Sequence, residues 1–327
     1  MIKEAMNKLL NNEDLTFIEA KEVFDEIFSG LANIVETTSF LTALEAKNPT
    51  EDEISAGIIS CNDSFKNPLA TFSNEQIQNI VFNNSNYFDF SVTNDIICAA
   101  NGLNSVDFAS NQSNKKQILK ELGFNFENKI SDFETTNLIY NTLDNDEPFI
   151  KYTSEISSST GFLSVLNIIN KFINPTKAKN IFLGVNNKNK VEKYARIMLK
   201  LGYQNSIVIA SNNDLPFISS SKDSIVAEAW KNKIFTYVVN WELMGFQKKD
   251  DEELKVENNK QAASIIQEVL DNKRKDVFYE GIVINSALAL YITKKADSLM
   301  DGIDLAKKTI ESSLAAEKFN QFKKNYQ

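Results

Sequence analysis

The chain has 327 residues, 43% of them apolar, and a formal net charge of -9 from 44 acidic and 35 basic residues. A chain of this size can bury one large core or two unequal ones. The charge argues against binding to nucleic-acid backbones or acidic membranes, because no block of basic residues offsets it. The chain also has no histidine, which excludes the commonest general base, the Ser-His and Cys-His nucleophile pairs and most zinc and iron sites.

Two further features concern the compartment. The two cysteines, Cys61 and Cys98, are too few for a disulfide framework, and the sequence opens without the pattern of a secretory leader. No apolar run approaches the roughly 20 residues that a membrane-spanning helix needs. We therefore expect a cytoplasmic protein with reduced cysteines and no membrane association.

The N-terminal part has the pattern of helices only. Thr16 and Glu19 form a capping box ahead of an apolar stripe, and Gly30 stands where a left-handed C-cap belongs. A second capping box, Thr50 with Glu53, opens a later helix. The sequence KNP at 66–68 and the polar residues up to Asn74 then indicate a linker. We expect a helical domain over residues 1–68.

Beyond the linker, short β-rich runs alternate with helical segments. The runs are IVF at 80–82, IFLGV at 181–185, SIVIA at 206–210 and IFTYVV at 234–239. Such alternation predicts a mainly parallel sheet with helices on its faces. Three helices are predicted to close the chain, near 259–271, 278–295 and 298–320. The predicted fold is thus α/β: a small all-helical N-terminal domain, and a larger α/β domain over 74–327 with a mainly parallel central sheet flanked by helices.

Several long segments carry a resemblance to a known family. They are LLNNEDLTFIEAKEVFDEIFSG at 9–30, SFLTALEAKNPTEDEISAG at 39–57, ILKELGFNF at 118–126, FLSVLNIINKFINPTKAKNIFLGV at 162–185 and the stretch from INSALALYITKK to AAEKF at 284–319. Together they resemble the anthranilate phosphoribosyltransferase family and, more broadly, the nucleoside phosphorylase fold. The resemblance implies a phosphoribosyl transfer that uses magnesium, in tryptophan biosynthesis. It also implies a homodimer formed through the N-terminal helices.

The first departure from the family lies after the first predicted strand. The family binds phosphoribosyl pyrophosphate on a turn that reads GTGGDG, whose glycines let backbone amides approach the phosphate. Here the turn reads Phe82, Asn83, Asn84 and Ser85 and is about three residues shorter. Phenylalanine fills space that the pyrophosphate needs. Asn83 and Asn84 preserve a tight turn but do not favour a nest of amides.

The next two family motifs have become more negative in charge. The motif NTFNIST corresponds to residues 86–92, where Asp89 replaces an asparagine that would face phosphate and Ser91 is retained. The motif KHGNR corresponds to LNSVDF at 103–108, where Asp107 stands roughly where a cation is expected. Exchanging a cation for a carboxylate beside a polyanion reverses the largest electrostatic contribution to binding.

The positions that the family uses for anthranilate and magnesium also differ. The stretch EISSSTG, which ends at Gly161, offers no arginine for the anthranilate carboxylate. The acidic pair that places magnesium corresponds to Pro216 and Phe217, and neither side chain can ligate a metal. Asn167 persists, as does Asn174 followed by proline, although such residues also serve as helix and turn scaffolding.

A polar run before a helix that opens at Lys115 is open to two interpretations. Ser110 to Asn114, with Lys115 and Lys116 after them, correspond to the family's serine-rich phosphate segment and could bind a small polar ligand. We favour a solvent-facing loop in which Ser113 or Asn114 is the N-cap. Lysines in a first helical turn are usually solvated, so we expect Lys115 and Lys116 to be exposed.

The preferred hypothesis is a noncatalytic relative that acts as a binding or regulatory protein and needs no cofactor. One alternative is an active glycosyl- or phosphoribosyl-transferase with a rearranged site and magnesium, and a second is a nucleic-acid-binding relative, against which the net charge speaks. Expected partners are a second copy of the chain and an unidentified small molecule or protein. No metal ligand is predicted, and the residues predicted to line a ligand cleft are Phe82, Asn83, Asn84, Asp89, Ser91, Asp107, Ser110, Ser113, Lys115 and Asn167.

Overall fold

The structure is a computed structural model and describes residues 1–64, 75–82, 86–107, 113–126, 137–140, 156, 159, 165–174 and 176–326. The chain divides into two compact units. Unit 1 comprises Met1–Thr71, Phe108–Asn111 and Thr142–Lys177. Unit 2 comprises Phe72–Asp107, Gln112–Asn141 and Ala178–Gln327.

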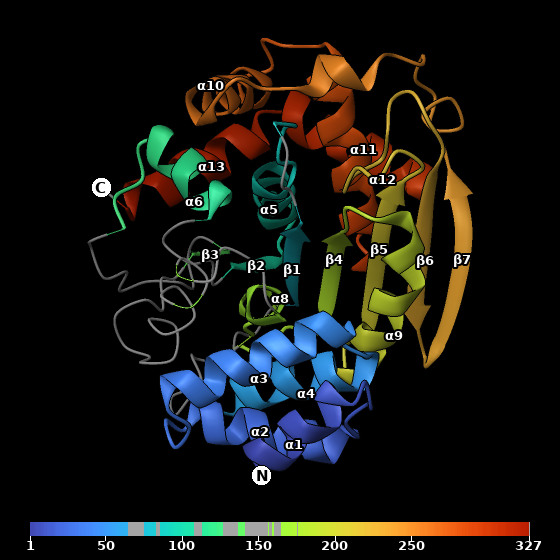
Figure 1. Ribbon diagram of the computed structural model, residues 1–327. Helices are drawn as coiled ribbons and strands as arrows, with labels where there is room; N and C mark the ends of the chain where they lie inside the picture. Colours follow the sequence, from blue (N-terminus) through green and yellow to red (C-terminus); the bar gives the residue numbers. More distant parts are fainter. Residues whose placement is uncertain are drawn as a thin grey trace. The chain divides into compact units, whose positions relative to one another are not determined.

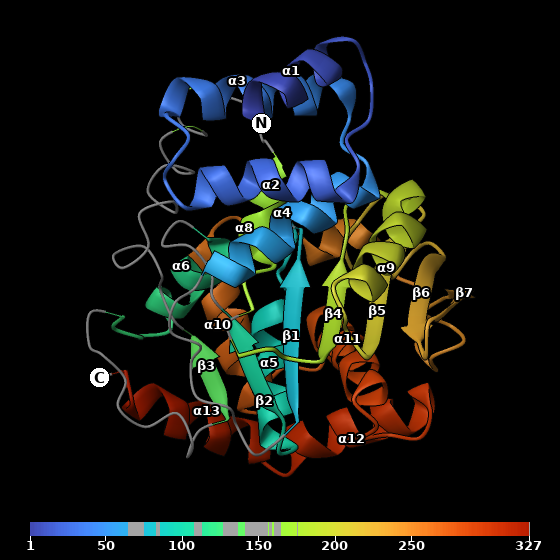
Figure 2. The same ribbon diagram turned by 90° about the horizontal axis from the view of Figure 1, so that it is seen from below.

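Unit 1 consists of helices in the described part of the chain (Figures 1 and 2). The predicted capping boxes are confirmed, since the Thr16 side chain accepts from the Glu19 N–H and the Thr50 hydroxyl accepts from the Glu53 N–H. Gly57 permits close packing of its helix against Ile169, because a Cβ there would lie 2.5 Å from the Ile169 side chain. The helices are α1 (Ile2–Leu10), α2 (Phe17–Phe28), α3 (Ile34–Lys47), α4 (Glu51–Ser64) and α8 (Val165–Lys171).

Unit 2 is built on one seven-stranded sheet with the order β3-β2-β1-β4-β5-β6-β7 (Figure 1). The strands from β3 to β5 in this order are parallel, and β6 and β7 continue the sheet as antiparallel neighbours. The strands are β1 (Gln76–Val81), β2 (Asn104–Asp107), β3 (Leu138–Tyr140), β4 (Asn180–Gly184), β5 (Asn205–Ser211), β6 (Ser224–Trp230) and β7 (Lys233–Val239).

Helices enclose this sheet. The helix α11 is apolar on all sides and almost wholly buried, as expected of a central helix, and it contacts α5, α12, β4 and β5. The helix α9 instead packs on β5 and β6 through a single apolar stripe. The helices are α5 (Ser91–Ala100), α6 (Asn114–Glu121), α9 (Val191–Lys200), α10 (Asn259–Leu270), α11 (Val277–Ile292), α12 (Leu299–Glu311) and α13 (Leu314–Lys324), with the 3-10 turns η1 (Lys188–Lys190) and η2 (Asp251–Leu254).

The predicted fold class is confirmed, with two differences in its elements. The predicted helix over 298–320 is wrong, because the chain breaks between α12 and α13 at Ser313, whose φ is 66°. The strands β2, β3 and β6 were not predicted. The proposed linker, 66–74, lies outside the described residues. No described helix combines the length and apolar character that a bilayer crossing requires.

Candidate functional site

The strand order of unit 2 reverses direction between β1 and β4. From β1 the sheet continues to β2 and β3 on one side, and from β4 it continues to β5 on the other. In open α/β sheets, ligands bind beyond the carboxyl ends of the strands at such a switch point. The residues after β1 and β4 are therefore the first place to look for a site.

Close packing occupies the end of these two strands. The Phe82 N–H donates to the Gly184 carbonyl oxygen at 2.8 Å, which extends the pairing of β1 with β4 by one residue. The Phe82 ring lies edge-on to Tyr194 of α9, with centroids 5.4 Å apart, and is 8% exposed. A Cβ on Gly184 would lie only 2.0 Å from the Pro216 carbonyl oxygen, so the loop after β5 lies directly on the end of β4.

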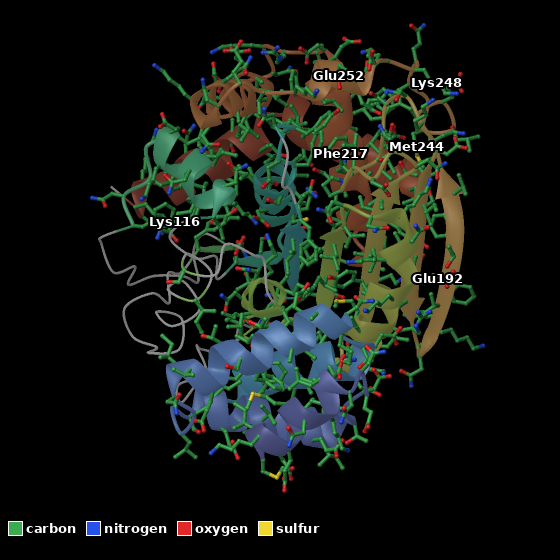
Figure 3. All side chains as sticks on the ribbon, viewed as in Figure 1. Lys116, Glu192, Phe217, Met244, Lys248 and Glu252 are labelled. Atoms are coloured by element: carbon green, nitrogen blue, oxygen red, sulfur yellow. The ribbon has the colours of Figure 1, made fainter. Side chains whose placement is uncertain are left out.

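A cluster of aromatic side chains lies around the loop after β5 and the start of α5. Phe217, labelled in Figure 3, is 1% exposed and packs on Phe90 and Tyr87 with centroids 5.2 and 5.8 Å apart. Phe88 joins Phe90 at 5.0 Å and Phe278 at 5.5 Å. Buried rings in these edge and tilted arrangements form an apolar core in the segments after β1 and β5.

The beginning of helix α5 is capped by a carboxylate. Asp89 Oδ1 accepts the Ser91 N–H at 2.9 Å and the Ser91 hydroxyl at 2.6 Å, and both residues are buried. The first N–H groups of a helix attract anions, because they lack intrahelical partners and carry the positive end of the helix dipole. At α5 the chain itself supplies the anion.

Beyond α5, a buried ammonium group joins two carboxylates. Lys115 Nζ lies 2.6 Å from Asp95 Oδ2 and 2.6 Å from Asp107 Oδ2, and it donates to the Asn79 carbonyl oxygen at 3.1 Å. The three acceptors match the three N–H groups of an ammonium ion. Burial acts to lower the pKa of Lys115, but the charges and hydrogen bonds of Asp107 and Asp95 outweigh it and raise the pKa above its usual value. Lys115 is therefore a fixed cation.

Asp95 is the centre of this buried polar cluster. Its Oδ1 accepts from the Ser105 hydroxyl at 2.5 Å and from the Asn79 amide at 2.8 Å, and its Oδ2 also accepts from the Tyr140 hydroxyl. Burial first, and then the charge of Asp95, raises the pKa of Tyr140 well above its usual value, so this hydroxyl remains a donor. The cluster thus joins β1, β2, β3, α5 and α6 through side chains.

A further buried carboxylate holds the loop that contains Phe217. Asp251 of η2 is 3% exposed and accepts five hydrogen bonds, from Ser219 Oγ at 2.6 Å, Ser221 Oγ at 2.6 Å, Asn213 Nδ2 at 2.9 Å, Ser220 N at 2.7 Å and Ser220 Oγ at 2.8 Å. Burial acts to raise the pKa of Asp251, but these donors outweigh it and lower the pKa. With five donors around it, this carboxylate has little remaining capacity for a ligand.

The cleft residues predicted from the sequence are only partly brought together. Phe82 follows β1, and Asp89 and Ser91 lie at the start of α5, whereas Asp107 and Lys115 meet in the buried cluster. Ser113 is the N-cap of α6, as predicted, and accepts the Lys116 N–H at 3.2 Å. Asn167 belongs to α8 in unit 1, where its Nδ2 is buried with no hydrogen-bond partner among the described residues. Asn83, Asn84 and Ser110 lie outside the described residues.

The prediction that the two lysines of α6 are exposed is wrong. Lys115 and Lys116 are 6% and 4% exposed, because one is drawn to the buried carboxylates and the other lies over the Phe126 ring at 5.0 Å. Asn79, Asp95, Ser105 and Tyr140 were not singled out from the sequence. The available signal was Asp95, a charged residue directly before the apolar stretch IICAA. A carboxylate on the buried face of a helix requires a partner, so Asp95 indicated a buried polar cluster.

The residues present do not fit a magnesium ion at the positions that the family resemblance indicates. Those positions are held by Pro216 and Phe217, and the latter is enclosed by aromatic rings. Among the described residues, no group of three or more acidic or cysteine side chains could hold a metal. The nearby Asp95 and Asp107 already share the ammonium of Lys115.

Comparison with known proteins agrees with the fold. Residues 83–316 match the glycosyl transferase family, a/b domain, and residues 3–58 match the helical bundle domain of the same family. The two matched domains and the seven-stranded sheet define a two-domain protein of the glycosyl transferase class.

Individual relatives narrow this class. The anthranilate phosphoribosyltransferase of Lacticaseibacillus paracasei is 30% identical over 335 residues, which cover 98% of this chain and 96% of the relative. The chain belongs to the anthranilate phosphoribosyltransferase family. Its fold is that of the Thermus thermophilus enzyme, with a TM-score of 0.88, 19% identity and coverage of 98% and 99% of the two chains. The Saccharomyces cerevisiae enzyme in complex with PRPP and Mg gives a TM-score of 0.86, 17% identity and coverage of 99% and 97%.

Proposed function

We propose that this chain is a noncatalytic member of the anthranilate phosphoribosyltransferase family that acts by binding or regulation. The observation that carries the proposal is the carboxylate of Asp89 at the start of α5, where it accepts both the N–H and the hydroxyl of Ser91. A phosphate at this helix end would compete with an internal anion for the same donors and would be repelled by its charge.

Two further features support the same proposal. The buried rings of Phe82 and Phe217 take up volume beside the switch point, where a diphosphate ester would need to lie. Lys115, which could have faced a phosphate, is neutralised by Asp95 and Asp107 inside unit 2. Free cations and free amides are the groups that bind a polyanion, and the described residues around the switch point offer few of either.

An assay of transfer tests this proposal. The full chain is incubated with phosphoribosyl pyrophosphate, magnesium and anthranilate, with the Lacticaseibacillus paracasei relative as the positive control. We expect the relative to consume anthranilate, which is followed by its fluorescence, and this chain to leave it unchanged. Sustained turnover by the chain, abolished by substitution of Ser91, would overturn the proposal.

The second candidate is an active transferase with a rearranged site and bound magnesium. It is supported by similarity over 98% of the chain to a relative named as an enzyme, and by the PRPP and Mg in the Saccharomyces cerevisiae neighbour. A panel of nucleobases in place of anthranilate tests this candidate, since a rearranged site would accept another acceptor. Release of pyrophosphate with any member of the panel would favour it.

We also propose a two-fold homodimer through the N-terminal helices. The proposal is supported by three apolar side chains at the start of α3 that are exposed in unit 1, with Leu31 80% and Val35 70% exposed beside Ile34. Exposed apolar residues grouped in this way are typical of an interaction surface. A two-fold arrangement is the commonest way for one such surface to bury itself.

A further inference from the structure

The strand β7 forms an open edge of the sheet in unit 2 (Figure 1). It pairs with β6 over seven consecutive residue pairs, from Trp230 with Lys233 to Ser224 with Val239, without an interruption in register. A two-residue turn of Lys231 and Asn232 joins the strands, and both residues have positive φ, 48° and 60°. Such a turn matches the twist of a regular hairpin, so β7 continues the sheet without a break in register.

The register fixes which backbone groups of β7 face outward. In a hairpin with a two-residue turn, the residues that flank the turn bond to each other, and every second pair does the same. Lys233, Phe235, Tyr237 and Val239 therefore bond to β6. The N–H and C=O groups of Ile234, Thr236 and Val238 point away from the sheet, and no described residue provides them with a backbone partner.

This edge lacks the usual protection against strand pairing. Natural edge strands are protected by charged side chains in the middle of the strand, by prolines or by bulges. In β7, the residues whose backbone groups point away from the sheet are Ile234, Thr236 and Val238. The side chains of Phe235 and Val238 are 50% and 54% exposed. An exposed, regular and apolar edge is a template for an additional strand.

The turn end of β7 carries positive charge. Lys231 lies over the half-exposed Trp230 ring at 4.1 Å, and Lys294 lies over the same ring at 5.4 Å. The ion pairs found among the described residues do not include Lys231, Lys233 or Lys294. Three such lysines at one end of an open strand complement the charge of an acidic segment that would pair with it.

We propose that the open edge of β7 binds an extended, acidic peptide segment of a partner protein, which adds to the sheet as a further strand. The backbone groups of Ile234, Thr236 and Val238 supply hydrogen bonds, and the lysines around Trp230 pair with the acidic side chains. The site is separate from the switch point between β1 and β4, so this proposal holds whether or not the chain transfers a phosphoribosyl group.

The test uses a fluorescein-labelled heptapeptide of alternating glutamate and valine, followed by fluorescence anisotropy with the full chain. We expect saturable binding at low salt that weakens several-fold at about 300 mM salt, because screening weakens the lysine contacts. A peptide with lysine in place of glutamate should bind at least about tenfold more weakly. Equal binding of the two peptides, or no binding of the acidic one, would overturn the proposal.

Two variants at one position isolate the role of the backbone. Thr236→Pro removes an outward N–H and leaves the ladder with β6 intact, whereas Thr236→Val retains the N–H. Both variants lose the weak hydrogen bond from the Thr236 hydroxyl to Glu192 of α9, the residue labelled in Figure 3. We expect Thr236→Val to bind as the original chain does and Thr236→Pro to bind at least about tenfold more weakly. Unchanged binding by Thr236→Pro would contradict strand addition.

Two controls complete the experiment. If Thr236→Pro does not fold, hydrogen exchange on the original chain replaces it, and the amides of Ile234, Thr236 and Val238 should exchange more slowly when the acidic peptide is present. Unaltered exchange there would count against the site. Sedimentation of the chain without peptide tests whether a second copy of the chain occupies the edge instead. If the chain associates and Thr236→Pro abolishes that association, β7 pairs with a second copy and the assignment of an acidic peptide is wrong.

Discussion

The ammonium nitrogen of Lys115 lies 2.6 Å from Asp95 Oδ2 in the interior of unit 2, and both side chains are almost completely buried. The contact joins helix α6 to helix α5, and Asp107 adds a contact from α6 to the end of β2. A buried ion of this kind costs desolvation energy and is tolerated only with its partners in place. Removal of the Lys115 ammonium therefore leaves the charges of Asp95 and Asp107 uncompensated in the interior of unit 2.

Lys115→Met should destabilise the protein strongly, because it keeps most of the side-chain volume and leaves Asp95 and Asp107 without their cation. We expect a loss of about 3–5 kcal/mol in the free energy of unfolding, measured with urea. The matched control is Lys120→Met, on the exposed side of α6, which should change the stability by less than about 0.5 kcal/mol. Similar values for the two variants would show that the buried ion contributes little.

Asp251→Asn should weaken the attachment of the Phe217 loop to η2. The amide cannot accept all five hydrogen bonds, so we expect a loss of about 1–3 kcal/mol at neutral pH. The pKa of Asp251 is lowered from 3.8 in the folded chain, so its contribution to stability is present above that value and is lost as the pH falls through the lower, folded pKa.

Urea unfolding of both proteins at several pH values checks this sign. The stability difference between the original chain and Asp251→Asn should be constant above about pH 5 and should shrink as the pH falls below about 4. A difference that grows at low pH would mean that the folded chain does not hold Asp251 as a carboxylate.

Asp89→Ala should remove the cap of α5. The Ser91 N–H and hydroxyl then lose their acceptor, and we expect a loss of about 1 kcal/mol in the free energy of unfolding. Asp89→Asn retains an acceptor oxygen and should lose less. An increase in stability in either variant would indicate that the carboxylate is strained at this position, and would weaken the interpretation of Asp89 as an internal anion.

Val35→Asp should dissociate the proposed homodimer, since it places a charge in the apolar patch at the start of α3. Light scattering coupled to gel filtration should show a dimer for the original chain and a monomer for this variant. Met300→Asp is the control, because Met300 is also exposed and belongs to unit 2. A monomeric original chain would rule out the dimer at the concentration used.

Much of the fold could be predicted from local signals. The capping boxes at Thr16 and Thr50 fix helix starts through contacts three residues apart, and the apolar runs of β4 and β5 are typical of buried parallel strands. The strands β2 and β3 have only four and three residues, too short to show a period. The proposed division into residues 1–68 and 74–327 stays a prediction.

The candidate site was predictable only where a single residue carried the information. Asp89 and Phe82 stood out because a carboxylate and a large ring replace groups suited to phosphate. Lys115 was misread as exposed, since its burial depends on Asp95, Asp107 and Asn79, which come from three other elements. Contacts between residues distant in sequence leave no local pattern, so only the fold reveals them.

The most direct test of the account is calorimetric titration of the full chain with phosphoribosyl pyrophosphate in the presence of magnesium. The account predicts no binding heat at ligand concentrations up to about 1 mM, because the proposed function rests on Asp89 and the rings of Phe82 and Phe217 excluding the diphosphate. A saturable heat with a dissociation constant in the micromolar range would contradict the account and would favour an active transferase.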